Sequence, residues 1–92
     1  MIRSFRDRDT LAFYEGKRVR RFDGFRDQAT RRLQMLDDAT ALRDLAGVPG
    51  NRVEALSGNR RDQFSIRINA QWRVCFRWGS DGPYDVEIVD YH

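Results

Sequence analysis

The chain has 92 residues, enough to bury one hydrophobic core but not to form a separate regulatory unit, so we expect a single domain over residues 1–92. The formal charge is +3, and 16 of the 17 basic residues are arginines, whose planar guanidinium groups suit phosphate and carboxylate ligands; a GC-rich coding sequence would explain the same excess. The single cysteine excludes a disulfide framework and a Cys/His metal cluster, and no apolar run approaches a membrane span. We therefore expect a cytoplasmic protein without metal, cofactor or membrane association.

Helices are predicted for the first half of the chain. A short strand at residues 2–5 precedes a brief helix that is capped by the Asp9-Thr10 pair and ends at Gly16. The clearest helix is predicted over residues 23–38, and a shorter helical turn over residues 40–46. The apolar residues at helical spacing along the long helix are Phe22, Phe25, Ala29, Leu33 and Leu36.

The most concentrated positive charge in the chain lies between the two predicted helices, at residues 17–21. Such a cluster is typical of a solvated linker or of a nucleic-acid contact. Of the two interpretations, we favour the linker slightly.

Strands are predicted for the second half, where the apolar period changes from 3.6 to 2. The strands are expected at residues 52–56, 64–68, 71–78 and 84–89, with breaker-rich turns between them. The alternation places one set of side chains toward the helices: Phe64, Ile66, Ile68, Trp72, Val74, Phe76 and Trp78. The opposite, uncovered face is expected to carry Ser65, Arg67, Arg73, Cys75 and Arg77. The predicted fold is α+β, with N-terminal helices packed on one face of a mainly antiparallel sheet.

Charge is distributed unevenly along these strands. Residues 52–78 carry 6 cations and 2 anions, whereas residues 79–92 carry 4 anions and no cation. If the strands are neighbours, the carboxylates can orient the arginines and tune a nearby titratable group, although cross-strand pairing for stability explains the pattern equally well. Cys75 lies among the arginines, which would lower the pKa of its thiol.

The chain ends in a carboxylate, a phenol and an imidazole, at Asp90, Tyr91 and His92. His92 is the only histidine, and its unperturbed pKa lies near neutrality, so an anchored His92 would serve as a general acid or base. A solvated, frayed tail is the competing interpretation.

The predicted arginine face suits one reaction in particular. Attack of a ribose 2′-hydroxyl on its own 3′-phosphate needs a base, cations for the phosphorane and an acid for the leaving 5′-oxygen. Glu54, the face arginines and His92 supply those groups. A binding platform without chemistry would carry similar arginines, so both interpretations stay open.

The sequence resembles the HigB branch of the RelE/ParE toxin superfamily. The residues that carry the resemblance are 1–5, 50–60, 64–69, 71–76 and 86–92, so it covers nearly the whole chain in matching order and spacing. The resemblance implies a compact RelE-like α+β microdomain, in agreement with the fold predicted from periodicity.

The resemblance also implies a function. It indicates the toxin of a type II toxin–antitoxin system, a metal-free and ribosome-dependent endoribonuclease that cleaves mRNA and inhibits translation. The implied partners are the ribosome, mRNA and a HigA-like helix-turn-helix antitoxin, with operator DNA reached only through the antitoxin. By position, Arg73 is the cation that stabilises the phosphate, and Asp90, Tyr91 and His92 belong to the catalytic site. The implied RNA or ribosome contacts are Arg60, Arg61, Arg67, Gln71 and Arg77.

The chain departs from the family pattern at two positions. Glu54 stands where the best-described branch has a histidine, and Ser57 stands where that branch often has a lysine. We therefore predict that Glu54 takes the 2′-hydroxyl proton and His92 protonates the leaving oxygen; the alternative is that Glu54 only pairs with an arginine.

Two other functional classes share this fold. A ParE-like protein inhibits gyrase without chemistry, and it needs no terminal acid or base. A toxin-derived co-repressor would keep only antitoxin binding. The Asp90, Tyr91 and His92 ending favours the nuclease.

Overall fold

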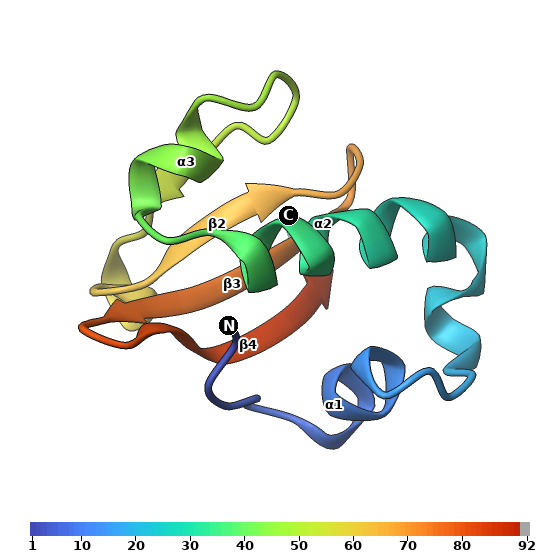
Figure 1. The fold of residues 1–92 in the computed structure, drawn as a ribbon. Helices are drawn as coiled ribbons and strands as arrows, with labels where there is room; N and C mark the ends of the chain where they lie inside the picture. The colour runs from blue at the N-terminus through green and yellow to red at the C-terminus, as the bar shows by residue number, and fades with distance from the viewer. Residues whose placement is uncertain (91–92) are drawn as a thin grey trace.

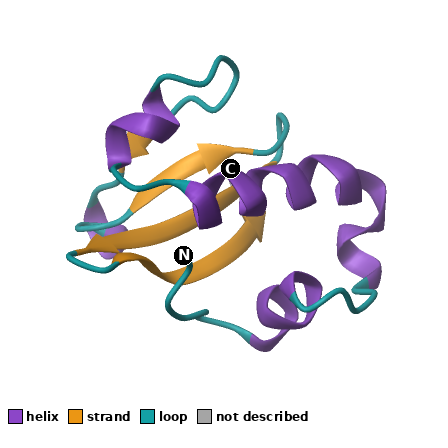
Figure 2. Ribbon diagram, viewed as in Figure 1, coloured by secondary structure: helices purple, strands orange, loops and turns teal. Residues whose placement is uncertain are grey.

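The computed structural model describes residues 1–90, so the predicted roles of Tyr91 and His92 lie outside the described residues. The molecule has two layers, a helical layer and a four-stranded sheet of order β1-β2-β3-β4, with each neighbouring pair antiparallel (Figures 1 and 2). The helical elements are α1 (Arg8–Tyr14), the 3₁₀ segment η1 (Arg20–Phe25), α2 (Arg26–Asp38), α3 (Leu42–Ala46) and the 3₁₀ turn η2 (Gly58–Arg60). The strands are β1 (Glu54–Ala55), β2 (Phe64–Arg67), β3 (Trp72–Gly79) and β4 (Gly82–Asp90). The α+β prediction is confirmed.

The core lies between α2 and one face of the sheet. In Figure 1, α2 crosses in front of the sheet, and α1 lies beside β4. Alternation along the strands predicted the inward side chains correctly, because Ile66, Val74 and Phe76 have no exposed surface and Ile68 is buried. On α2, the inward residues Ala29, Leu33 and Leu36 meet them at helical spacing. No helix among residues 1–90 is long and apolar enough to cross a membrane.

The predicted opening strand forms only one isolated bridge, between Phe5 and Val86. Residues 3–6 nevertheless follow the outer edge of β4: Arg3 N donates to Pro83 O at 2.8 Å, Val86 N donates to Ser4 O at 3.1 Å, and Arg6 N donates to Val86 O at 2.9 Å. The segment thus satisfies the edge of β4 without building a regular ladder.

The N-cap of α1 is Asp7 instead of the predicted Asp9. An Asp7 carboxylate oxygen accepts the backbone N–H of Thr10 at 3.2 Å, whereas Asp9 lies inside the first turn and pairs with Arg21. Thr10 is fully buried, and its hydroxyl oxygen accepts the N–H of Ile88 at 3.0 Å, so this residue joins α1 to β4. The helix ends before Gly16, as predicted, and Gly16 takes φ 91°.

The predicted long helix is divided into η1 and α2. The 3₁₀ segment places Phe22 and Phe25 three residues apart on one side, where both rings meet Trp72 of β3 at centroid distances of 5.8 and 4.7 Å. Arg21 lies over the Phe22 ring and pairs with Asp9, while Arg18 pairs with Asp23 in the same region. These local ion pairs support the interpretation of residues 17–21 as a linker over that of a nucleic-acid contact.

The third helix begins two residues later than predicted. The carboxylate of Asp44 accepts the backbone N–H groups of Thr40 and Ala41 at 3.0 and 3.1 Å, so these residues cap α3 from outside it. The same hydrogen bonds, with that from the Thr40 hydroxyl, lower the pKa of Asp44.

The last hairpin is tighter than predicted. Gly79 pairs with Gly82, so β4 begins at Gly82 instead of Tyr84 and only Ser80 and Asp81 form the loop. Gly82 has φ 118°, and a Cβ there would approach the Met1 carbonyl oxygen to 3.1 Å, so the turn requires glycine.

The sheet face away from α2 is covered at its centre, contrary to the prediction that it is open. Ser65 and Cys75 have no exposed surface, and Arg73 is 7% exposed. The covering comes from the segment around β1 and η2. Its Arg52 carbonyl reaches Arg73, and its Arg60 side chain crosses to Glu87 on β4.

Candidate active site on the covered sheet face

Arg73 lies at the centre of the candidate site, held by neighbouring strands. Its Nε donates to the Ser65 hydroxyl oxygen at 2.7 Å, and its Nη2 donates to the Arg52 carbonyl oxygen at 2.5 Å and, more weakly, to the Ser65 carbonyl oxygen at 3.5 Å. Most of the side chain is out of solvent, with 9% exposed. The Nε–Nη2 edge of the guanidinium is therefore fixed by the protein itself.

Glu54 lies on the other side of this guanidinium. Its Oε1 is 3.8 Å from Arg73 Nη1, and 52% of the Glu54 side chain is exposed. The structure thus brings together the predicted base and the predicted phosphate-stabilising cation. A half-exposed carboxylate beside a fixed cation is an arrangement in which an incoming hydroxyl and phosphate can meet both groups.

The chain before β1 is shaped to supply the Arg52 carbonyl. Arg52 takes φ 46°, a left-handed backbone conformation that few residues other than glycine adopt. Its neighbour Asn51 is fully buried, and the Asn51 side-chain amide donates to the Leu45 backbone oxygen at 3.1 Å. The backbone oxygen of Asn51 accepts the Arg67 N–H at 2.6 Å. This segment is consequently anchored to both α3 and β2.

Cys75 lies beneath the arginines as a neutral thiol. It is opposite Ser65 on one side and Glu87 on the other, and it has no exposed surface. Burial raises the pKa of Cys75 to about 11, an effect that Arg60 and Arg73 oppose and Glu87 supports. The expected lowering of this pKa is wrong, because desolvation outweighs the nearby positive charges.

Arg60 reaches the same face from η2. Its Nη1 donates to Glu87 Oε1 and to Gln63 Oε1, both at 3.1 Å, and 33% of its side chain is exposed. Glu87 also lies 3.9 Å from Arg6 Nε. The predicted RNA contact at Arg60 is therefore an arginine held in place by a carboxylate.

The other predicted binding residues surround this centre at varying distance. Arg61 is exposed, Arg67 is half-buried at the end of β2, and Arg77 lies beyond a bulge in β3 with its Nε 3.5 Å from Asp85. Gln71 is exposed and donates its amide to Asp90 at 2.9 Å. The binding roles of these four residues stay predictions.

Asp90 lies on the sheet face opposite to that of Arg73. It pairs directly with Trp72, whose ring packs against η1, so its register places it on the α2 side and not on the side of Arg73. The acid–base part of the predicted site continues into Tyr91 and His92. Among residues 1–90, the structure contains no group of three or more His, Cys, Asp or Glu side chains that could hold a metal ion.

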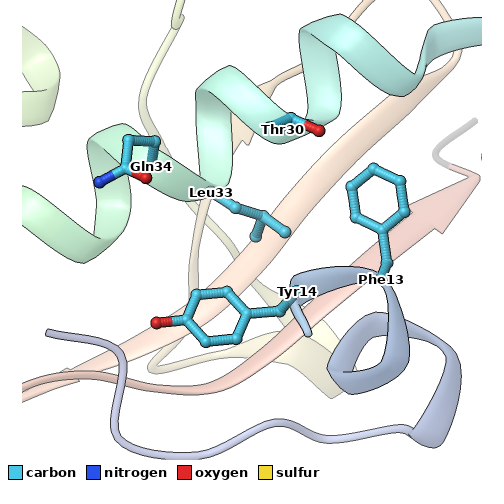
Figure 3. A pocket seen from close by; sticks show the side chains of 5 residues that line it. All are labelled: Phe13, Tyr14, Thr30, Leu33 and Gln34. Carbon is cyan, nitrogen blue, oxygen red and sulfur yellow. The ribbon is translucent and has the colours of Figure 1, made fainter. Parts of the chain in front are cut away.

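A shallow pocket lies between α1 and α2. Figure 3 shows Phe13 and Tyr14 of α1 facing Thr30, Leu33 and Gln34 of α2 around it. The Tyr14 hydroxyl donates to Asp37 at 3.1 Å, and burial followed by this carboxylate raises the pKa of Tyr14. Of the predicted catalytic residues that the structure describes, Glu54, Arg73 and Asp90, none lines this pocket.

Two contributors to the site were missed from the sequence. Ser65 was placed on the correct face but given no role, and the Arg52 carbonyl was not considered. The available signal was register, because alternation puts Ser65 on the face of Arg73; the left-handed turn at Arg52 has no sequence signal, since arginine rarely adopts it.

The sequence is similar to known toxins over most of its length. A family model described as "RelE-like toxin of type II toxin-antitoxin system HigB" matches residues 3–92. Toxin HigB-1 of Vibrio cholerae serotype O1 is 39% identical over 80 residues, 85% of this chain and 84% of that protein. Endoribonuclease HigB of Proteus vulgaris is 33% identical over 70 residues, 72% of this chain and 71% of that protein.

The fold also matches a solved structure. The YoeB-YefM complex from Staphylococcus aureus contains a chain that aligns with a TM-score of 0.63 at 15% identity, covering 100% of this chain and 98% of that one. At this identity the likeness concerns the fold alone. The family match extends over nearly the whole sequence, and the chain therefore belongs to the HigB-like toxins, the RelE-like toxins of type II toxin–antitoxin systems.

Proposed function

We propose that this toxin is a ribosome-dependent endoribonuclease that cleaves mRNA and so inhibits translation. The observation that carries the proposal is the Arg73–Glu54 pair, a buried and fixed guanidinium 3.8 Å from a half-exposed carboxylate. The name of the Proteus vulgaris relative, an endoribonuclease, supports the same reaction class.

The proposed reaction is transfer of the phosphate to the neighbouring ribose hydroxyl. Glu54 removes the 2′-hydroxyl proton, the 2′-oxygen forms a bond to phosphorus, and the bond to the 5′-oxygen breaks as His92 protonates it. The products are a 2′,3′-cyclic phosphate and a 5′-hydroxyl end, so atoms and charges balance.

Arg73 has a different role in this scheme. Negative charge grows on the phosphorane oxygens in the transition state, and a cation that is already oriented stabilises this charge without reorganising. Tyr91 is proposed to act with His92 in the same site, and Asp90, whose register lies on the α2 side of the sheet, is proposed to support them from the end of β4. Arg60, Arg61, Arg67, Gln71 and Arg77 are proposed to contact RNA or ribosome.

An antitoxin partner follows from the family. We propose that this partner is a HigA-like helix-turn-helix protein, that operator DNA is reached only through it, and that the toxin acts in the cytoplasm. Toxins of this kind need a partner that neutralises them until translation is to be stopped.

The test is cleavage of a defined mRNA on 70S ribosomes by the purified protein, mapped by primer extension, with His92→Ala alongside. We expect a cut in the A site that the variant makes at least about 100-fold more slowly, the usual range for loss of a general acid or base. The same mRNA without ribosomes is the control for ribosome dependence.

Failure has a distinct readout. Folded protein that makes no cut would overturn the nuclease proposal. Inhibition of gyrase supercoiling by that same protein would then support a ParE-like toxin, and operator binding with antitoxin alone would support a co-repressor.

A further inference from the structure

Ser65 contacts Arg73 through its side chain. It is fully buried on β2, and its hydroxyl oxygen accepts the Arg73 Nε–H at 2.7 Å. The donor of this hydrogen bond is a charged guanidinium, and a charge-assisted hydrogen bond is roughly twice as strong as a neutral one.

The sheet register makes Ser65 a neighbour of both members of the pair. It lies directly opposite Glu54 of β1, and it lies opposite Cys75, two residues from Arg73 on β3. Side chains in direct and diagonal cross-strand positions on one face are within reach of one another. Ser65 therefore lies on the strand between those of the base and the cation, with its side chain on the same face as both.

A second contact also holds the guanidinium. Arg73 Nη2 donates to the Arg52 carbonyl, which the left-handed backbone at Arg52 directs to this point. The two acceptors occupy the same Nε–Nη2 edge, so they oppose rotation of the guanidinium plane. The Nη1 nitrogen then stays on the side where Glu54 lies, 3.8 Å away.

We propose that Ser65 is a positioning residue for cleavage: its hydroxyl fixes the orientation of Arg73 so that Nη1 meets the phosphorane next to Glu54. This inference rests on the proposed nuclease function. A misplacement of about 1 Å can cost on the order of 100-fold in rate, so a group that never touches RNA can control the reaction.

The central comparison is Ser65→Thr against Ser65→Val. These variants have nearly the same shape and differ in the hydroxyl, so any loss of stability from the added carbon atoms is shared. Ser65→Ala tests removal of the hydroxyl without added volume. Thr10→Val is the matched control, because it also removes a fully buried hydroxyl that accepts one N–H, from Ile88.

The first readout is single-turnover cleavage on programmed ribosomes over a range of toxin concentrations. We expect Ser65→Ala and Ser65→Val to lower the maximal rate about tenfold or more, while the half-saturating concentration changes less than about twofold. Ser65→Thr should keep at least about half of the wild-type rate, and Thr10→Val should cleave as wild type does once folded.

The second readout does not depend on activity. In ¹⁵N-arginine NMR spectra, the Nε–H of Arg73 should exchange slowly with water in wild type and Ser65→Thr, and at least about tenfold faster in Ser65→Ala. The signal is assigned by its absence in Arg73→Lys.

The outcomes separate the inference from the function on which it rests. Wild type that cuts, with folded Ser65→Ala and Ser65→Val cutting at the same rate, overturns the role of Ser65 and leaves the nuclease intact. Wild type that does not cut overturns the nuclease itself. A higher half-saturating concentration with an unchanged maximal rate would also overturn the proposal, because it would place Ser65 in binding.

Discussion

Arg60 of η2 donates a hydrogen bond to Glu87 of β4 at 3.1 Å, although η2 connects β1 to β2 and β4 is at the opposite edge of the sheet from β1. The Arg60–Glu87 pair therefore crosses the sheet face that carries Arg73, above the buried Cys75 thiol, which is opposite Glu87. Because a carboxylate holds Arg60 in one position, the guanidinium is oriented before any RNA arrives.

Replacing Arg60 tests whether this cation contacts RNA. We expect Arg60→Ala to weaken binding to a short single-stranded RNA and to reduce the magnitude of the slope of log K against log salt by about 0.7, the value for one lost phosphate contact. Arg43→Ala, which removes an exposed arginine from α3, is the control. Equal slopes for the two variants would remove Arg60 from the binding surface.

Arg73→Lys retains the charge but not the geometry. One ammonium group cannot contact the Ser65 hydroxyl, the Arg52 carbonyl and the Glu54 carboxylate at the same time. We therefore expect a loss of about 2 kcal/mol in the free energy of unfolding. Cleavage should fall on the order of 100-fold, as on removal of one transition-state donor. Urea unfolding and single-turnover cleavage measure the two effects.

The control for this variant is Arg31→Lys, an exposed exchange on α2 that should change neither quantity. Wild-type cleavage by Arg73→Lys would show that charge alone is sufficient at this position.

Glu54→Gln removes the proposed base and preserves its shape. The Glu54 side chain is half exposed, so we expect little change in stability, but cleavage should fall about 100-fold or more because glutamine cannot accept the proton. Glu15→Gln is a matched control, since Glu15 is equally exposed and also lies near a cation, Lys17. Full activity of Glu54→Gln would reduce Glu54 to a partner of Arg73.

Cys75 predicts a loss of stability at alkaline pH. Its pKa is raised to about 11 in the folded protein, so above pH 9 the unfolded chain releases the thiol proton first and binds fewer protons than the folded one. The free energy of unfolding therefore falls as pH rises from about 9 to about 11, by on the order of 2 kcal/mol. At neutral pH this group contributes no such dependence.

The measurement is urea unfolding at pH 8 and pH 11 for wild type and Cys75→Ala. The variant has a constant penalty for the cavity, and the raised pKa of Tyr14 acts equally in both proteins, so only their difference matters. We expect wild type to lose more stability than Cys75→Ala over this range. Parallel curves would mean that the thiol is not desolvated.

The parts of the fold with strict periodicity were predictable from sequence. Alternation placed Ile66, Val74 and Phe76 in the core, and helical spacing placed Ala29 and Leu33 against them, because each pattern follows from backbone geometry alone. The split at Phe25 was not predictable from local spacing, and Phe25 packs there on Trp72, which lies far away in sequence.

The sequence predicted which residues form the candidate site better than it predicted their surroundings. Periodicity and the family resemblance identified Arg73 and Glu54, and the structure brings them together. The same reasoning predicted that the face with the arginines is open to solvent and that the pKa of Cys75 is lowered, and both predictions were wrong. Both errors have one cause: the segment over this face, around Arg52 and Arg60, has no periodic pattern to show that it folds back.

Residues 3–6 along the outer edge of β4 have a consequence for self-association. These residues occupy backbone donors and acceptors of β4 that would otherwise be unpaired at the edge of a sheet, including the N–H and C=O of Val86. A shortened protein that lacks this segment would present a bare strand, which is a template for pairing with the same strand of another molecule. The opening residues therefore block strand pairing between molecules at this edge of β4.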